Sequence, residues 1–305
     1  MTILLAAETN PLKSRLDPEA WILWRRIFLG RRSSKRAMGL ALSQTRHFVH
    51  RPAGPLRRYV REILWVRSEC PRVQILLPET TLTLVLRQSG SGSLHNEKLP
   101  NAVVSGLQQQ TRVVEHGAGS SVVIVRFTEA GAPAILHDRV DLFYNQTLAL
   151  DTVLPRQEIA DTLSLLAGTR EIGEQVQAVE RFLSSRIREQ NGATRQIEAA
   201  VQMIRSTEGR SSIAAVARQA SMSQSALERH FRAAVGATPK SLSRLARLHH
   251  VCRLWDAGKR LTDIAFAAGY SDQPHMVRDF RLFTGTSPEE FFRSTIPRNL
   301  PTFYK

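Results

Sequence analysis

The spacing of hydrophobic residues changes along the chain and divides it into a strand-like part and a helical part. Between Arg51 and about Leu154, short runs rich in β-branched residues are separated by turn-forming residues, and several runs alternate between apolar and polar positions, as strands do. The predicted strands are 73–77, 81–86, 102–104, 111–114 and 121–127, flanked by helical pieces at Leu56–Trp65 and Ala130–His137. We therefore predict a β-rich regulatory domain over residues 38–155, built as a barrel or a sandwich.

The pattern over residues 157–189 predicts two amphipathic helices. In the second helix, apolar residues recur at three- and four-residue spacing and make one face: Ile172, Val176, Val179, Phe182, Leu183 and Ile187. This face is either core packing or a dimer seam, and no heptad run is long enough to choose between them. Residues 156–193 are assigned as a helical connector that can also serve dimerisation.

From Thr194 onward the chain is predicted to be almost wholly helical, and one pattern occurs twice in it. Residues 213–223 match residues 261–271 at an offset of 48, and the match continues at an offset of 49 through Leu227/Met276, Arg229/Arg278, Phe231/Phe280, Arg232/Arg281, Gly236/Gly285 and Pro239/Pro288. Such a repeat indicates two copies of one supersecondary unit.

Each copy has what a helix-turn-helix unit requires. Ala217 and Ala265 are small where two helices must cross closely. Gly269 suits a left-handed turn residue, whereas Ser221 at the equivalent position is expected to be strained. Ser223 in the first unit, and Ser271 or Asp272 in the second, are the predicted N-caps of the second helices.

The periodicity also predicts which face of each second helix is exposed. Leu227, Phe231 and Val235 make the buried face in the first unit, and Met276, Phe280 and Phe283 make it in the second. Arg can pair with guanine and Gln with adenine, so an exposed face with these residues is typical of major-groove readout, although some of the arginines are expected to contact phosphate only. A merely solvated face is the alternative. The candidate DNA-binding residues are Gln224, Ser225, Glu228, Arg229, Arg232, Gln273, Pro274, Val277, Arg278 and Arg281.

Between the two units, residues 239–257 predict a long helix that would hold both second helices at a fixed separation. If that separation is close to one DNA turn, about 34 Å, one chain can enter two adjacent major-groove segments on the same face of the duplex. His249 and His250 on this helix are interpreted as packing or surface residues.

Charge supports a polyanionic partner. The chain has 42 Lys and Arg against 27 Asp and Glu, a formal net charge of +15, which favours nucleic acid or an anionic membrane. Residues 195–305 hold 17 of the basic and 9 of the acidic residues, a higher net charge per residue than the rest of the chain taken together, so a nucleic-acid site is expected there.

Other function classes find little support. Cys70 and Cys252 lack the spacing of a disulfide framework or zinc site, and no apolar run is long enough to span a bilayer. His95, His116 and His137 are scattered, and Asp138 and Asp141 are interpreted as loop or helix surface. We predict no catalytic residues, no metal and no cofactor, and a cytoplasmic protein without a membrane partner.

The first 37 residues differ from the rest, because an apolar patch at 21–24 is followed by a cluster of arginines and lysines. We interpret residues 1–37 as a basic extension that is a mis-assigned start or disordered, with an arm that contacts DNA phosphates as the alternative. Met38 opens a sequence that is typical of a domain start.

The segment from Thr194 to Arg293, about a third of the chain, resembles the AraC/XylS family of bacterial transcription regulators, most closely over residues 263–288. The resemblance implies seven helices with two helix-turn-helix units joined by a linker helix, often in a dimeric activator. Ser221 replaces the usual turn glycine, and Pro274 and His275 replace small polar residues. The β-rich part is similar to the sensory domains of this family in general pattern only.

Together these features predict an α+β chain: a β-rich sensory, barrel-like domain followed by an all-α DNA-binding domain over residues 194–305. The expected function is that of a sequence-specific transcription regulator, effector-responsive and an activator rather than a repressor. Its expected partners are double-stranded promoter DNA, RNA polymerase, a small-molecule effector and a second copy of the chain. The alternative is a non-specific architectural DNA-binding protein.

Overall fold

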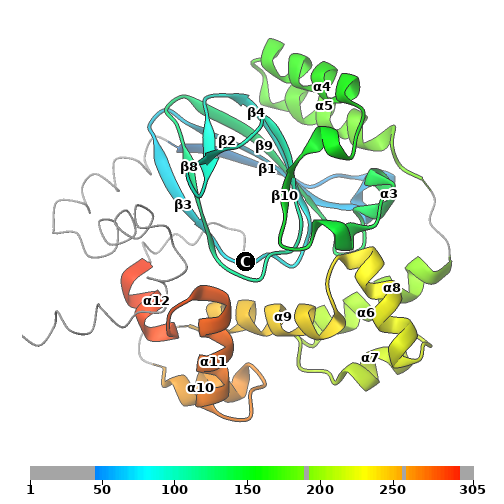
Figure 1. Cartoon of the computed structure of the whole chain (residues 1–305), viewed down its shortest axis with the longest axis vertical. Coiled ribbons are helices and arrows are strands. Elements are labelled where there is room, and N and C mark those ends of the chain that lie inside the picture. The colour runs from blue at the N-terminus through cyan, green and yellow to red at the C-terminus, as the bar shows by residue number, and fades with distance from the viewer. Residues whose placement is uncertain (1–44, 189–191, 256–258, 296–305) are drawn as a thin grey trace, which may run out of the picture.

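A computed structural model describes residues 45–188, 192–255 and 259–295. Figure 1 shows a β-rich N-terminal part above a layer of helices formed by the C-terminal part, with a pair of helices at the outer side of the sheets. This arrangement confirms the predicted fold class. The predicted basic extension, residues 1–37, lies outside the described residues.

The N-terminal domain contains two antiparallel sheets that do not close into one barrel. Sheet A has six strands in the order β1-β2-β9-β4-β7-β10, and sheet B has four in the order β3-β8-β5-β6. The strands are β1 (Thr45–His50), β2 (Val60–Ser68), β3 (Arg72–Leu76), β4 (Thr83–Ser89), β5 (Gly92–Leu94), β6 (Glu97–Lys98), β7 (Ala102–Ser105), β8 (Arg112–His116), β9 (Ser120–Phe127) and β10 (Thr147–Ala149).

All five predicted strands are present, but the helix predicted at Leu56–Trp65 is wrong. The chain forms a short 3-10 helix, η3 (Gly54–Arg58), and then enters β2, which pairs with β1 on one side and β9 on the other. Ile63 and Trp65 pack into the core on one face of β2, whereas Leu64 and Val66 form a second cluster on the other. Because both faces are buried, the strand has no alternation of apolar and polar residues to identify it.

The segments after β9 are short. The helix predicted at Ala130–His137 is confirmed in part, as α3 (Pro133–Leu136), and the 3-10 helices η4 (Val140–Phe143) and η5 (Leu150–Thr152) flank β10.

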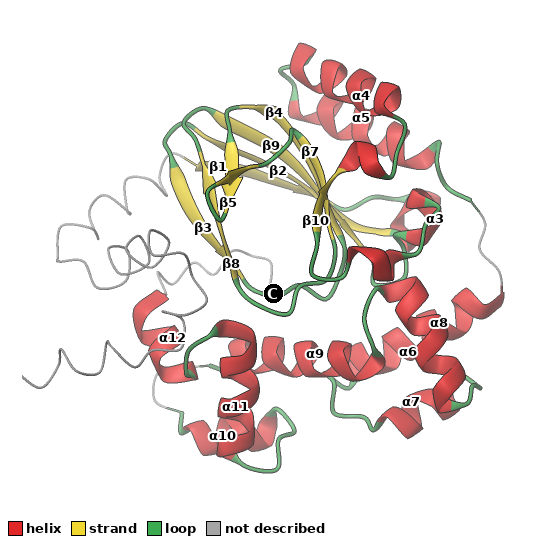
Figure 2. Cartoon of the chain, viewed as in Figure 1, coloured by secondary structure: helices red, strands yellow, loops and turns green. Residues whose placement is uncertain are grey.

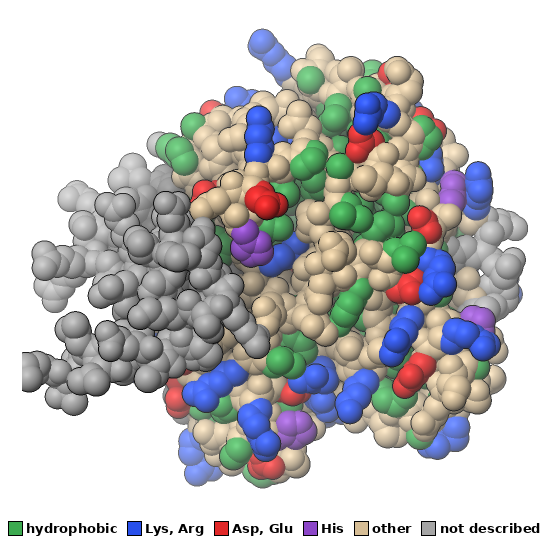
Figure 3. Space-filling model, viewed as in Figure 1, with side chains coloured by type: hydrophobic (Ala, Val, Ile, Leu, Met, Phe, Trp, Pro, Cys, Tyr) green, Lys and Arg blue, Asp and Glu red, His purple; other side chains and the backbone are tan. Residues whose placement is uncertain are grey.

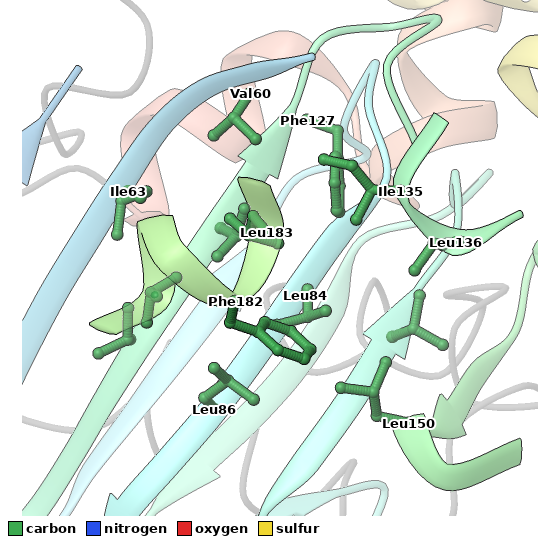
Figure 4. Packing of buried hydrophobic residues seen from close by; sticks show 14 of the residues in the cluster. Val60, Ile63, Leu84, Leu86, Phe127, Ile135, Leu136, Leu150, Phe182 and Leu183 are labelled. Carbon is green, nitrogen blue, oxygen red and sulfur yellow. The ribbon is translucent and has the colours of Figure 1, made fainter. Parts of the chain in front are cut away.

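The connector forms two helices, α4 (Arg156–Gly168) and α5 (Ile172–Ser184), that cover one face of sheet A. Figure 4 shows Phe182 and Leu183 of α5 against Leu84 and Leu86 of β4. The apolar face of the second connector helix is therefore buried within the chain itself, which decides between core packing and a dimer seam in favour of core packing.

Seven helices follow in the described part of the C-terminal domain, as the family resemblance implied. They are α6 (Gly192–Ser206), α7 (Ile213–Gln219), α8 (Gln224–Val235), α9 (Pro239–Leu254), α10 (Leu261–Ala267), α11 (Gln273–Thr284) and α12 (Pro288–Thr295). Helix α9 corresponds to the predicted linker helix and lies between α7/α8 and α10/α11 in Figure 1. Residues 256 and 257 of the predicted helix lie outside the described residues.

The β domain packs directly on the helices. Leu77, Leu107 and Ala130 belong to the same hydrophobic cluster as the helical core, and η4 packs against α8. Thr111, just before β8, donates from its backbone N–H and from its hydroxyl to the carbonyl of Phe283 in α11, at 2.9 and 3.2 Å. The ring of His249 in α9 forms a hydrogen bond with the carbonyl of Pro78, beyond β3, at 2.8 Å.

Among the described residues, no helix is long and apolar enough to cross a membrane. The described part of the chain also contains no group of three or more metal-ligating side chains.

Candidate nucleic-acid interface

The first helix-turn-helix unit consists of α7 and α8. Val216 and Ala217 of α7 are buried. Burial of the small residue Ala217 agrees with the close crossing of α7 and α8 predicted at this position. Ser221 in the turn has a φ of 53°, a left-handed conformation that is unfavourable for a residue with a side chain. The predicted N-cap is confirmed, because the Ser223 hydroxyl accepts a hydrogen bond from the Ala226 backbone N–H at 3.2 Å.

The second unit, α10 and α11, has the same construction, but a glycine occupies the left-handed position of its turn. Gly269 has a φ of 81°, and a Cβ at this position would lie 2.5 Å from Cγ of Arg210, so both the conformation and the space favour glycine. Asp272, one of the two predicted N-caps, accepts from the His275 backbone N–H at 2.7 Å. This hydrogen bond lowers the pKa of the Asp272 carboxyl below its usual value, and the Ser271 hydroxyl adds to the effect.

The buried and exposed faces of both second helices are as predicted. Leu227, Phe231 and Val235 are buried in α8, and Met276, Phe280 and Phe283 are buried in α11. The structure places all ten candidate residues at the surface: Gln273 and Val277 are partly exposed, and Gln224, Ser225, Glu228, Arg229, Arg232, Pro274, Arg278 and Arg281 are exposed. Figure 3 shows many Lys and Arg side chains over the helical domain.

The arginines of the two exposed faces form no ion pairs within the described residues. Within the described residues, Arg229, Arg232, Arg278 and Arg281 lie within ion-pair distance of no carboxylate, although Arg278 donates to the Pro274 carbonyl at 3.3 Å. The faces therefore present guanidinium groups that have no ion-pair partner among the described residues, as binding to a phosphate or a guanine edge requires.

Two polar side chains in the second unit are held in place by neighbours. The amide oxygen of Gln273 accepts a hydrogen bond from the Thr262 hydroxyl of α10 at 2.9 Å, so one recognition residue is tied to the preceding helix. The His275 ring contacts Tyr270 edge to face, with 5.3 Å between the ring centroids. The His275 ring therefore contacts the turn between α10 and α11 of the same unit.

Asp279, a buried residue of α11 that supports the exposed face, was not among the residues predicted from the sequence. Asp279, 7% exposed in α11, accepts a bidentate pair of hydrogen bonds from Arg244 of the linker helix, at 2.7 and 3.3 Å. Arg247 lies 3.9 Å away on the same helix. The ion pair fixes α11 against α9, and its signal in the sequence is an acidic residue at a position where the helical period requires burial.

The two histidines of α9 act as predicted for packing and surface residues. His249 is buried, and His250 lies 2.7 Å from the Glu208 carboxylate. Burial lowers the pKa of both rings from their usual value.

Residues 216–294 match a family model described as a helix-turn-helix domain. The matched range begins within α7 and includes α8, α10 and α11. The C-terminal part of the chain therefore contains a helix-turn-helix domain of the AraC type. The AraC-type domain thus consists of α7 to α12, with the linker helix α9 between its two units. This family is one of transcription regulators and is not an enzyme class.

The full chain also has similarity to solved structures. ToxT from Vibrio cholerae has 14% identity and a TM-score of 0.41 over 82% of this chain and 98% of its own. A second ToxT structure, with unsaturated fatty acid bound, has 13% identity and a TM-score of 0.39 over 73% and 94%. The AraC-like transcriptional activator CuxR has 9% identity and a TM-score of 0.28 over 69% and 88%. No curated protein matches the sequence significantly.

A second polar site lies in the β domain. The side chains of Arg72 (β3), Arg87 (β4) and His116 (β8) gather at one end of the space between sheets A and B. Burial lowers the pKa of the His116 imidazole to about 3, and both guanidinium groups add to the effect. His116 is therefore neutral at physiological pH.

The buried imidazole makes stability depend on pH. His116 is 8% exposed, and its pKa is depressed in the folded state, so the unfolded chain takes up a proton below about pH 6.5 while the folded chain does not. Its contribution is fully present above pH 6.5 and is lost as the pH falls toward 3, at about 1.4 kcal/mol per unit. Between pH 7 and pH 5 the loss is expected to be about 2 kcal/mol.

Urea unfolding of the wild type and of His116→Gln at both pH values measures this contribution. The variant should lose less stability on acidification than the wild type does, because the other titrating groups are the same in both proteins. An equal loss in the two proteins would contradict the assignment.

Proposed function

We propose that the protein is a sequence-specific transcription regulator that reads promoter DNA with α8 and α11 together. The observation that carries this proposal is the pair of capped helices whose exposed faces hold four arginines without a carboxylate partner in the described residues. An architectural binder needs only positive charge, and two separately built recognition helices favour the sequence-specific function over that alternative.

In this proposal, the N-terminal turns of the two helices enter successive major-groove segments. Gln224 and Gln273, in the first turns of α8 and α11, are placed to read adenine, and Arg229 and Arg278 to read guanine or to grip phosphate. Helix α9 sets the separation of the two helices, which the mechanism requires to be about 34 Å, one turn of the duplex. The ion pair between Arg244 and Asp279 would preserve that separation on binding.

The proposed regulation uses the β domain as a sensor for a small molecule. This domain contacts the AraC-type domain at α8, α9 and α11, so a shift between the sheets would change how both units face DNA. We propose that the regulator acts in the cytoplasm as an activator, through a contact with RNA polymerase, and as a homodimer. Two copies of the chain would cover two such sites on one promoter.

The experiment that tests the function is selection of genomic DNA fragments by the purified full chain at physiological salt, with sequencing of the bound fraction. A motif with two half-segments about one helical turn apart is the expected result. The ratio of specific to non-specific affinity is then measured at fixed salt. Featureless enrichment and a ratio near one would support the architectural alternative instead.

Replacing Arg278 or Arg229 by alanine is expected to weaken binding to the selected site by about 1–3 kcal/mol if the residue reads a base, because a bidentate contact is lost. If the residue contacts phosphate, all sequences should weaken about equally and the salt dependence should fall. Fluorescence anisotropy with a selected and a scrambled duplex distinguishes the two results. The control is Arg156→Ala, which changes a highly exposed arginine of α4, outside the helix-turn-helix units. This variant should bind the selected duplex as the wild type does.

A further inference from the structure

Arg72 and Arg87, like Arg112, form no ion pair among the described residues, whereas other arginines of the β domain do. Arg126 pairs with Glu62 and Glu79, both at 3.1 Å, and Arg61 pairs with Glu129. Arg87 is only 4% exposed, yet its guanidinium donates only to neutral oxygens, the Ser91 carbonyl at 3.1 Å and the Ser120 hydroxyl at 2.9 Å. A buried charge without an opposite charge is costly, so this arrangement requires an explanation.

The neighbours of Arg87 increase the cost. Arg72 is partly buried and donates to the amide oxygen of Gln74 at 3.3 Å, and it pairs with no carboxylate in the part of the chain that the structure describes. The two guanidinium groups repel one another. Nε of Arg72, Nε of Arg87 and Nδ1 of His116 are buried without a hydrogen-bond partner among the described residues. The cluster thus has donor capacity and positive charge that the chain itself leaves unused.

The cluster borders a pocket of about 600 Å³, formed where β3 and β5 begin and β8 ends. Arg72 and His116 line the pocket, Lys98 lies at it with its side chain exposed, and Gly92 forms part of the wall in front of Arg87. A Cβ at Gly92 would lie 2.1 Å from Nη2 of Arg87, so the absence of a side chain there is what gives the guanidinium its space. Glu115 is the acidic residue of the lining, and the Ser93 hydroxyl donates to it at 3.5 Å.

The geometry points to a binding site for the anionic group of a small-molecule effector, a carboxylate or a phosphate, held by Arg72 at the pocket wall, with His116 and Lys98 beside it and with the positive charge of Arg87 behind Gly92. Guanidinium groups bind planar oxyanions through paired hydrogen bonds, and a bound anion would supply the missing opposite charge. A pocket of this volume accepts a small organic molecule. This inference rests on the proposed sensor function of the β domain, whose ligand class it specifies.

Thermal unfolding of the full chain in a chloride buffer tests the site, with inorganic phosphate, butyrate and benzoate as probes and butyramide and benzamide as their neutral controls. At least one anion should raise the unfolding midpoint in a saturable way, while the matched amide should not. Arg72→Met and Arg87→Met should each weaken binding about tenfold or more, the loss of one charge-assisted contact.

Arg72→Met has a second expected signature, which a merely structural arginine would not give. Without ligand, Arg72→Met should unfold at the same or a higher temperature than the wild type, because it removes repulsion. Arg126→Met, which breaks two ion pairs, should unfold at a lower temperature and still respond to the anion. Gly92→Ala keeps the charge but displaces the Arg87 guanidinium, and should weaken anion binding if Arg87→Met fails to fold.

Three results would overturn the site: no anion stabilises the wild type, the amides stabilise it as well as the acids do, or Arg72→Met and Gly92→Ala respond like the wild type. The same samples are assayed with a selected DNA duplex. Specific DNA binding without an anion response contradicts the anion site alone, whereas an anion response without specific DNA binding contradicts the proposed regulator.

Discussion

Phe280→Ala is expected to lower the free energy of unfolding by about 3–5 kcal/mol, the range for truncating a fully buried phenylalanine. Phe280 is 1% exposed in α11, and its ring contacts Phe291 and Phe292 of α12 at centroid distances of 5.5 and 5.7 Å. Truncation leaves a cavity at the point where the second unit joins the rest of the helical domain. Urea unfolding followed by circular dichroism measures the change.

Two further phenylalanines make the comparison specific. Phe231 holds the equivalent position in α8 and is fully buried, so Phe231→Ala should cost a similar amount. Phe266 of α10 is 60% exposed, and Phe266→Ala should change stability by less than about 0.5 kcal/mol. A loss below about 1 kcal/mol for Phe280→Ala would mean that the aromatic cluster of α11 and α12 is not packed as described.

Asp279→Ala is expected to cost about 3–5 kcal/mol, because it leaves Arg244 and Arg247 beside a buried site without their carboxylate. The loss should be accompanied by weaker specific DNA binding, since the ion pair is what joins α11 to the linker helix. The exposed pair Arg260–Asp263 on α10 provides the control, and Asp263→Ala should cost no more than about 1 kcal/mol.

A double variant separates two contributions to the free energy of unfolding: the cost of leaving a charge unpaired and the net contribution of the ion pair itself. Arg244→Met combined with Asp279→Leu removes both partners, and it should recover most of the stability lost in Asp279→Ala. It should not recover specific DNA binding if the ion pair orients α11. Full recovery of both would mean that apolar packing positions this helix equally well.

The second helices of the two units were predictable from the sequence because each is amphipathic along its length and keeps one face exposed. Leu227, Phe231 and Val235 fix the phase of α8, and the positions of the exposed residues follow from that phase. The strain expected at Ser221 is also confirmed, since the turn imposes the same backbone conformation whether or not a glycine occupies it. Which exposed residues contact bases stays a prediction.

The β domain was less predictable, and β2 shows why. Strand β2 lies between β1 and β9 in sheet A, and both of its faces are buried. Helix α5 packs on one face, and on the other Leu64 and Val66 form a cluster with Val122 of the neighbouring strand β9. Alternation disappears when neither face meets water, and the remaining apolar run fits a buried helix equally well. The packing that made it a strand comes from segments as distant as α5.

The cluster of Arg72, Arg87 and His116 could not be found from local patterns at all. Arg72 and His116 lie on the paired strands β3 and β8 of sheet B, and Arg87 lies on β4 of sheet A. The three residues meet only when the two sheets come together. Arg87 also adjoins a register shift between β4 and β9, so its burial does not follow from a regular alternation along the strand. Its position depends on tertiary structure that the single sequence does not express.

The paired strands β3 and β8 join two distant parts of the molecule. Arg72 and His116 are register partners at one end, and at the other end Pro78 contacts α9 and Thr111 contacts α11. The distance from Thr111 to His116 is about 17 Å at the rise of an extended chain. If an anion favours one position of this strand pair, the coupling must be reciprocal. Promoter DNA would then change the affinity for the anion by the same factor by which the anion changes the affinity for DNA, so the promoter would itself set the anion concentration to which the protein responds.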